Sequence, residues 1–322
     1  MKFSKGIIWS EERRKWLCYD DALIDAVLNS NHFVVPTYDY SDLEKKFDKD
    51  FSFTKQVINH FPLANEGANH LDLRNRMMQD VNTNLVNAIG IFRESFRERV
   101  LAIKQSSGPI NIATPIIESI LESNLTFANI DLGEDIDYSD LTLMLDDSQS
   151  IKSRLVREKL IKILALKLEE KDRFYKLALM SVGVNALIST TLHSFIKVLI
   201  NYDYESLIGR KCFYSNGIKH LERVCSHDTV VGGNEVKAGD KLRLYVESYE
   251  HGNHRDSKKM KKFFAIGSNH ACIGMSFSLS VWKELTGVLQ DNFEDMRIVS
   301  FDYRSNDSIF NFPVKVFVEY SK

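Results

Sequence analysis

The stretch of sequence that decides the fold is Phe264-Ala-Ile-Gly-Ser-Asn-His-Ala-Cys-Ile-Gly-Met-Ser-Phe-Ser278. Here Cys272 lies between a glycine-bearing loop and the first turn of an apolar segment, 273–289, whose pattern predicts a helix. The amides and the positive end of that helix would point at the sulfur, which lowers a thiol pKa and favours thiolate. Gly274 would permit the close approach of something flat. From this window alone, an ordinary buried cysteine in a loop is an equally good interpretation.

Around this window the chain is predominantly helical in pattern. Only 5 Pro and 15 Gly interrupt its 322 residues. An acidic stretch, 131–147, has weaker periodicity and is predicted to be a loop. Helical periodicity is found in 19–29, 70–104, 112–123, 151–168 and 173–200. The last of these is apolar nearly all round, which is typical of a helix in the middle of a large core.

Strand signals are concentrated late in the chain. Residues 229–237 read as a hairpin with Gly232-Gly233 as its turn, and 242–246 follow as a strand. Residues 312–320 alternate valines with other residues and predict a last strand. The sequence therefore predicts a mainly α fold with a small, late β component.

Composition excludes several classes of protein. Lys and Arg number 42 and Asp and Glu 44, and this net charge of −2 is not the basic excess typical of nucleic-acid binding. No run approaches 18 apolar residues, so no membrane-spanning helix is expected, and the first residues lack the apolar core of a secretory signal. We therefore expect a cytoplasmic protein. The four cysteines form no CxxC pair, which argues against a disulfide framework or a thiolate zinc site.

The cysteine window resembles that of the cytochrome P450 superfamily. The family's loop has a basic residue two positions before the cysteine and a glycine two positions after it, which His270 and Gly274 match. Two positions depart from the family pattern: Ala265 stands where the family has phenylalanine, and the family's glycine pair is reduced to Gly267 and Ser268.

Further segments match the family in the correct order. Residues 66–74 resemble the start of its C-helix, and His70 and Arg74 are four apart, on one helix face. Residues 221–240 resemble its arginine-led β-hairpin, beginning with Arg223.

Residues 303–316 resemble the family's C-terminal strand pair. The matches extend from about residue 60 to the end, so the resemblance implies one haem-thiolate domain over 1–322 with the P450 fold.

The resemblance implies haem b, iron protoporphyrin IX, as cofactor and Cys272 as its metal ligand. His70, Arg74, Arg223 and His270 match the family's partners of the two haem propionates, whose burial requires cationic donors. Each alone would more often be a surface charge. A thiolate ligand favours cleavage of an O–O bond.

The family's I-helix carries an acid–alcohol pair that relays protons during oxygen activation, and this pair is missing. Gly183 occupies the kink position, Asn185 takes the place of the acid, and the threonine position is apolar. Ser189, Thr190 and Thr191 follow about one turn later. One of them could substitute, but hydroxyls that bond to their own helix are the more common case.

The family's Glu-x-x-Arg pair is missing as well, since its places fall on Arg210 and Phe213. The chain is short between Arg74 and Gly183 and between Arg255 and Cys272. We therefore expect a shortened lid and a shortened meander.

Lysines at 258, 259, 261 and 262 form a basic cluster before the cysteine loop. In the family this face docks an acidic ferredoxin or flavodoxin, so the cluster (Lys258–Lys262) is a candidate redox-partner surface. A solvated loop is the other interpretation.

Three functions remain open. The first is a monooxygenase-like haem-thiolate oxidoreductase acting on a small organic molecule in specialised metabolism, including one tethered to a carrier. The second is a haem-thiolate enzyme that does not activate O₂: a peroxide user, isomerase or dehydratase. The third is a non-catalytic relative serving as a partner protein, which the presence of Cys272 disfavours. In the first two, Cys272, Asn185 and Ser189 are the candidate catalytic residues, and Gly183 and Gly274 would lie against the haem.

Overall fold

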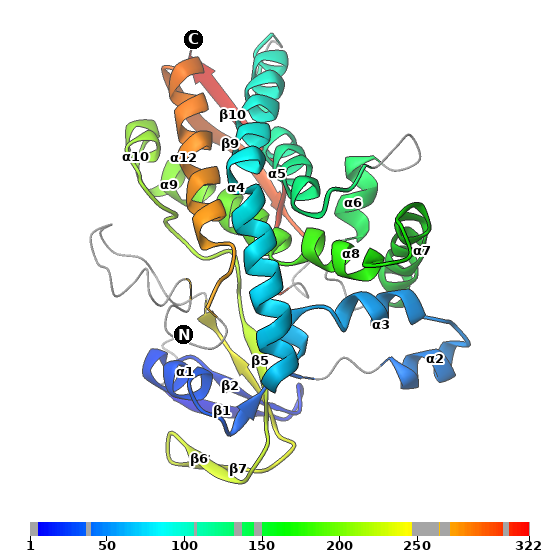
Figure 1. Cartoon of the computed structure of the whole chain (residues 1–322). Helices are drawn as coiled ribbons and strands as arrows, with labels where there is room; N and C mark the ends of the chain where they lie inside the picture. Colours follow the sequence, from blue (N-terminus) through cyan, green and yellow to red (C-terminus); the bar gives the residue numbers. More distant parts are fainter. Residues whose placement is uncertain are drawn as a thin grey trace.

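The computed structural model describes residues 6–36, 40–105, 108–131, 137–144, 150–246, 264, 271–304 and 309–321. Helices dominate, and small sheets lie at the two ends of the molecule (Figure 1). The mainly α fold with a small sheet component is therefore confirmed.

Each segment predicted to be helical contains a helix, and the structure adds short helices outside those segments. The helices are α1 (Asp21–Leu28), α2 (Ser41–Phe47), α3 (Ser52–Ile58), η1 (Pro62–Ala64, a 3-10 turn), α4 (Gly67–Ile103), α5 (Ala113–Ala128), α6 (Tyr138–Met144), α7 (Ile151–Lys167), α8 (Arg173–Ser181), α9 (Val184–Asn201), α10 (Tyr204–Ile208) and α12 (Met275–Asn292). The additional helices are α2, α3, η1, α10 and α6, the last of which lies in the acidic stretch predicted to be a loop. It forms because Leu141 and Met144 are buried, at 1% and 3% exposure, despite the surrounding acidic residues.

The strands lie in three sheets. They are β1 (Ile7–Ser10), β2 (Lys15–Cys18), β3 (Phe33–Val34), β4 (Ile110–Asn111), β5 (Leu221–Cys225), β6 (Thr229–Val231), β7 (Asn234–Val236), β8 (Lys241–Leu244), β9 (Asp295–Tyr303) and β10 (Pro313–Ser321). One sheet has the order β1-β2-β8-β5-β3, a second β4-β10-β9, and β6 and β7 form the third.

The β component is not confined to the late part of the chain, because β1, β2 and β3 come from its first 34 residues. The first two have four residues each, too short for a recognisable period. β2 pairs in parallel with β8, matching Trp16 with Leu242, so its partner is distant in sequence.

Two predicted β features are confirmed. Residues Gly232 and Gly233, with φ of 56° and 82°, form the turn between β6 and β7, and both angles suit glycine. β9 and β10 form the expected C-terminal antiparallel pair, with Tyr303 opposite Pro313.

The apolar run 173–200 is broken by a turn at Val182-Gly183, which separates α8 from α9. Gly183 has φ +74°, a left-handed conformation that favours glycine. By length and composition, Arg173–Asn201 is apolar enough to cross a membrane, but 72% of its most apolar window is buried inside the structure. That burial fits a core helix.

The main core lies among α4, α5, α9 and α12. Phe92, Phe96, Phe195 and Trp282 are fully buried there. Helices α4, α5 and α12 lie together in Figure 1, and the ring of Phe277 meets that of Phe127 on α5 at 4.8 Å. This packing fixes α12, and with it the residue that precedes its first turn, Cys272.

Candidate functional site

Cys272 lies just before α12, as the sequence predicts. The helix begins after Gly274, which serves as its N-terminal cap without a side-chain hydrogen bond. The Cys272 amide donates to the Phe264 carbonyl at 2.8 Å. A methyl group at Gly274 would lie 4.0 Å from the sulfur, an ordinary contact. The cysteine is solvent-accessible, unlike the buried Cys18 and Cys225.

The electrostatics of the thiol differ in part from the expectation. The Gly274 amide bonds to the sulfur and the positive charge of Arg74 acts on it, and both lower its pKa. Desolvation by the surrounding protein outweighs both, so the pKa of Cys272 is raised above its ordinary value. The predicted amide interaction is present, but the predicted net lowering of the thiol pKa is wrong for the protein alone.

Arg74 is brought to the cysteine by α4. Its guanidinium Nη1 donates to the carbonyl of Ala271 at 2.5 Å, across 197 positions of sequence. His70 lies one turn earlier on the same helix and is 4% exposed. Its Nδ1 lies 2.8 Å from the Pro62 carbonyl, which holds the ring against η1. The helix therefore brings Arg74 to the residue before Cys272, with His70 one turn away and held against η1.

Arg223 comes from a different element, strand β5, and is 7% exposed. Its Nη1 donates to the carbonyl of Glu222 at 2.8 Å. Arginines are seldom this deeply buried unless they are paired. His270 and the Lys258–Lys262 cluster lie outside the described residues.

The hydroxyls of α9 are mostly occupied by other groups. Ser189 Oγ donates to the Asn185 carbonyl at 2.5 Å, within its own helix. Thr190 Oγ1 accepts from the Gly217 amide at 3.0 Å. Thr191 Oγ1 is buried and has no hydrogen-bond partner among the described residues. Gly183 forms the cap at the start of this helix, and Asn185 follows in its first turn.

Sequence reasoning missed a buried histidine on this helix. His193 is 4% exposed, and its Nδ1 lies 2.7 Å from the Tyr303 hydroxyl. Burial lowers the pKa of His193 to about 4, and the charges of Lys197 and Lys219 act in the same direction. Helical spacing is a signal that could have found it, since Asn185, Ser189 and His193 are successively four apart.

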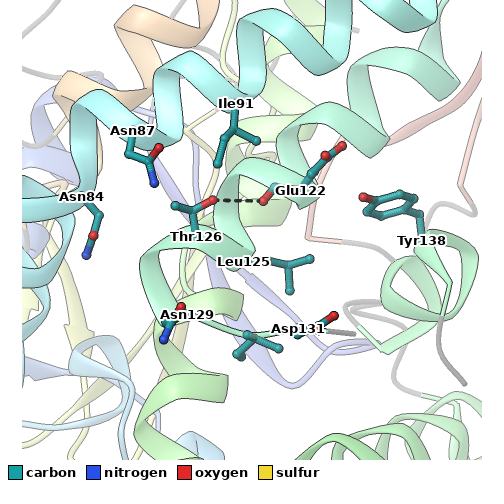
Figure 2. Close-up of a pocket in the computed structure, with 10 residues that line it drawn as sticks. Asn84, Asn87, Ile91, Glu122, Leu125, Thr126, Asn129, Asp131 and Tyr138 are labelled. Carbon is teal, nitrogen blue, oxygen red and sulfur yellow. Dashed lines mark hydrogen bonds between the residues drawn. The ribbon is translucent and has the colours of Figure 1, made fainter. Parts of the chain in front are cut away.

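A separate hollow of about 670 Å³ lies between α4, α5 and α6. In Figure 2, Asn84 and Asn87 reach it from α4, and Tyr138 lies on the far side. Its lining residues are Asn84, Asn87, Ile91, Glu122, Leu125, Thr126, Asn129, Ile130, Asp131 and Tyr138. None of them belongs to α9 or α12, so the hollow is distinct from the surroundings of Cys272.

Comparison with known proteins finds the same overall fold in one class of solved structures. No protein-family model matches the chain, and no curated protein matches it significantly in sequence. Cytochrome P450 CREJ, solved with (4-ethylphenyl) dihydrogen phosphate, superposes with a TM-score of 0.78 at 12% identity, covering 99% of this chain and 94% of that chain.

Two further structures give similar values. The cytochrome P450 CYP109B1 from Bacillus subtilis has a TM-score of 0.73 at 14% identity, covering 99% of this chain and 97% of its own. P450BioI, solved with a fatty-acid-ligated acyl carrier protein, has a TM-score of 0.68 at 14% identity, with coverage of 95% and 92%. At these identities the likeness establishes the fold.

Proposed function

Starting from a chain with the cytochrome P450 fold, we propose that this protein is a haem-thiolate oxidoreductase, monooxygenase-like, with Cys272 as the ligand of haem iron. The observation that carries the proposal is the position of Cys272. It is an accessible thiol before the first turn of α12, with the Gly274 amide on its sulfur and Arg74 beside it. An amide and a cation at a sulfur both stabilise the thiolate form that a metal ligand requires.

The donor set fits haem b. Two propionates need cationic partners when buried, and His70 and Arg74 share a helix that reaches the cysteine end of α12. Arg74 already forms a hydrogen bond to the carbonyl preceding Cys272, so its guanidinium is within the neighbourhood of a haem bound there. Arg223, from the sheet, and His270 complete the proposed set.

Haem held by thiolate supplies oxidative chemistry that no amino-acid side chain provides. The chain supplies binding and orientation. The Gly274 amide and the Arg74 charge stabilise the thiolate, and Gly274 leaves the sulfur uncrowded. On the other side of the site we place Gly183, Asn185 and Ser189 of α9.

A second candidate is a haem-thiolate enzyme that does not activate O₂: a peroxide user, isomerase or dehydratase. The occupied hydroxyls of α9 favour it. Ser189 donates to its own helix and Thr190 accepts from Gly217, while Asn185 cannot titrate as an acid would. Oxygen activation requires delivered protons, whereas these other reactions do not need that relay.

We further propose a single domain over 1–322, a cytoplasmic location, no nucleic-acid or membrane partner, and a small-molecule substrate of specialised metabolism. Carrier tethering is included because a structure of this fold was solved with an acyl carrier protein. A ferredoxin or flavodoxin would dock at the Lys258–Lys262 face. A non-catalytic partner role stays the weakest alternative while Cys272 is present.

The test is an optical spectrum of the purified protein with haem, reduced and exposed to carbon monoxide. We expect a thiolate-type spectrum that disappears in Cys272→Ala and persists in Cys212→Ala, a matched change at a half-buried cysteine. A thiolate-type spectrum from Cys272→Ala, or none from the wild type, would contradict the proposal.

A further inference from the structure

Residues 210–217, which we call the strap, connect α10 to the segment before β5 and contact both α9 and α12. Several of their partners are buried, including Trp282, Thr190 and Ser194 at 0%, 5% and 0% exposure. The contacts at the two ends are of different kinds.

At the α12 end the strap is held by an aromatic cluster. The indole Nε1 of Trp282 donates to the Arg210 carbonyl at 2.9 Å, and its ring meets that of Phe213 at 5.1 Å. The Arg210 guanidinium lies 4.9 Å from the ring centre of Tyr214 and 5.6 Å from that of Tyr202, the residue that caps the C-terminus of α9. Cation–π contacts and a buried indole bond both depend on geometry, so this end is fixed in orientation as well as in distance.

At the α9 end the strap is held by hydroxyls. Ser194 Oγ donates to the Ser215 carbonyl at 2.8 Å and accepts from the amides of Tyr214 and Ser215 at 3.2 and 3.0 Å. Thr190 Oγ1 accepts from the Gly217 amide at 3.0 Å. These side chains satisfy backbone groups that would otherwise be buried without partners.

Gly217 sets the separation between the strap and α9. A Cβ atom built there would lie 2.3 Å from the Thr190 nitrogen and 2.4 Å from the Ser189 carbonyl carbon. The backbone of the strap therefore packs directly against the backbone and the Ser189 Cβ atom of α9. On its other side, the Gly217 carbonyl accepts from the Asn311 amide at 2.7 Å, so the strap cannot retreat from α9 without breaking that bond.

The strap thus joins two helices whose first residues form the candidate site: Cys272 precedes α12, and Gly183 precedes α9. We propose that the strap, through Trp282 and Thr190, positions the Cys272 sulfur relative to α9. Both are positioning residues, since they act on the site through the helices that carry them. The inference rests on the proposed haem-thiolate function.

The test uses the haem-loaded full chain and two variants that each remove one polar contact. Trp282→Phe removes the indole N–H that binds Arg210 and keeps an aromatic ring. Thr190→Val removes the hydroxyl that binds Gly217 and keeps the side-chain shape. Each has a matched control away from the strap. Tyr320→Phe removes a hydroxyl bond to the Lys104 carbonyl, and Thr142→Val removes a hydroxyl that bonds within α6.

The readout is the fraction of the reduced carbon monoxide complex that has the thiolate-type spectrum, at matched folded fractions determined by denaturant unfolding. We expect the ratio of non-thiolate to thiolate forms to rise about fivefold in Trp282→Phe and Thr190→Val, the effect of losing one hydrogen bond. The controls should leave the ratio at the wild-type value.

If both strap variants keep the wild-type ratio, the positioning role is refuted even though the haem-thiolate function stands. If Trp282→Phe does not fold, Thr190→Val alone decides. If the wild type itself gives no thiolate-type spectrum, the proposed function fails first, and the two failures are thereby distinguished.

Discussion

Helices α9 and α12 have the same length, 18 residues, and each begins after a glycine that makes no side-chain capping bond. The two glycines are there for different reasons. Gly183 has φ +74°, and a Cβ atom there would meet nothing within 4 Å, so its backbone conformation selects glycine. Gly274 has φ −92° and ψ 12°, angles open to any residue, but it lies beside the Cys272 sulfur.

The starts of the two helices also differ in the chemical groups that they present. At α12 the first turn meets the thiol of Cys272, whose sulfur accepts from the Gly274 amide. At α9 the helix begins after the turn at Gly183, Asn185 carries an amide, and the hydroxyls of Ser189 and Thr190 form hydrogen bonds to Asn185 and Gly217. In the proposed site, the residues before α12 would therefore supply the iron ligand, and α9 would supply mainly the shape of the opposite wall.

The largest expected effect concerns oxygen. With no acid at Asn185 and the Ser189 hydroxyl bound to its own helix, hydroxylation of surrogate substrates with O₂ and a redox partner should be slow. A proton shuttle contributes typically about 10²–10⁴-fold to such a step. Turnover with peroxide should exceed turnover with O₂, measured as product formed per haem. Efficient, coupled hydroxylation with O₂ would show that α9 keeps its chemistry too.

The second prediction concerns the buried ionisable group of α9. The pKa of His193 is lowered to about 4. Between pH 4 and 6.5 the unfolded chain is therefore protonated at this histidine, whereas the folded protein is not. Stability should be full above pH 6.5 and fall as the pH drops toward 4, by about 3 kcal/mol for this residue. Burial lowers the pKa of His220 to about 4 as well, which adds to the fall.

His193→Gln should flatten this dependence by up to about 1.4 kcal/mol per pH unit, as followed by urea unfolding between pH 4 and 7. The exposed His227→Gln is the control. An unchanged slope in His193→Gln would mean that α9 is more open to water at this point than its burial indicates.

The third prediction concerns Arg74 on the α12 side. Arg74→Ala removes the charge that lowers the Cys272 pKa, so alkylation of the thiol in the haem-free protein should become slower. Haem retention should weaken as well, by about 1–3 kcal/mol, since a partly buried propionate would lose its partner. Haem transfer to an acceptor protein measures the second effect independently of the first.

Arg76, two residues along α4, is not a suitable control for Arg74. Although Arg76 lies on another face of α4, its guanidinium stacks 3.6 Å above the Tyr175 ring and pairs with Asp172 at 3.1 Å. Its loss would loosen α4 from α8. Arg97, whose side chain is 42% exposed and lies 3.7 Å from its partner Glu94, is the appropriate control. Equal haem loss from Arg74→Ala and Arg97→Ala would refute the placement of Arg74 at the site.

The smallest expected effect compares the two glycines directly. Gly183→Ala should destabilise the protein by about 1 kcal/mol, because alanine is strained at φ +74°. Gly274→Ala should change the free energy of unfolding by less than about 0.5 kcal/mol. Guanidinium unfolding of the haem-free protein checks both. A larger loss of unfolding free energy in Gly274→Ala would mean that the backbone conformation beside the Cys272 sulfur also requires glycine.

The candidate residues near α12 could be identified from the sequence because each is a distinctive residue type at a short, fixed spacing from another. Cys272 before an apolar helix, and His70 and Arg74 four apart, could be placed without a structure. The hydrogen-bond partners of Ser189 and Thr190 could not be predicted. The partner of Thr190 is Gly217, 27 positions away in sequence, and from the sequence alone either hydroxyl could equally well have faced the site. Nothing in the sequence indicated that Arg210 would lie against the rings of both Tyr202 and Tyr214.

In the fold, long periodic helices were predictable and short non-local strands were not. The helix breaks at Gly183 although the apolar pattern continues without interruption. The break depends on the φ angle of this glycine, which hydrophobic periodicity cannot predict. The helix α6 could not be predicted because the acidic residues around it are typical of a loop. Only the burial of Leu141 and Met144 distinguishes it from one.

The parallel pairing of β2 with β8 has a consequence for how the protein is made. Strand β2, with Trp16, Leu17 and Cys18, emerges from the ribosome early, but the residues it pairs with, Leu242 to Leu244, are synthesised near the end. At about 5–20 residues per second, β2 waits on the order of 10–45 s for its partner. During that time the first hairpin presents an unpaired edge and two tryptophans, Trp9 and Trp16, to the cell. Slower translation lengthens this exposure, so the yield of folded protein depends on holding that edge apart from other chains until β8 arrives.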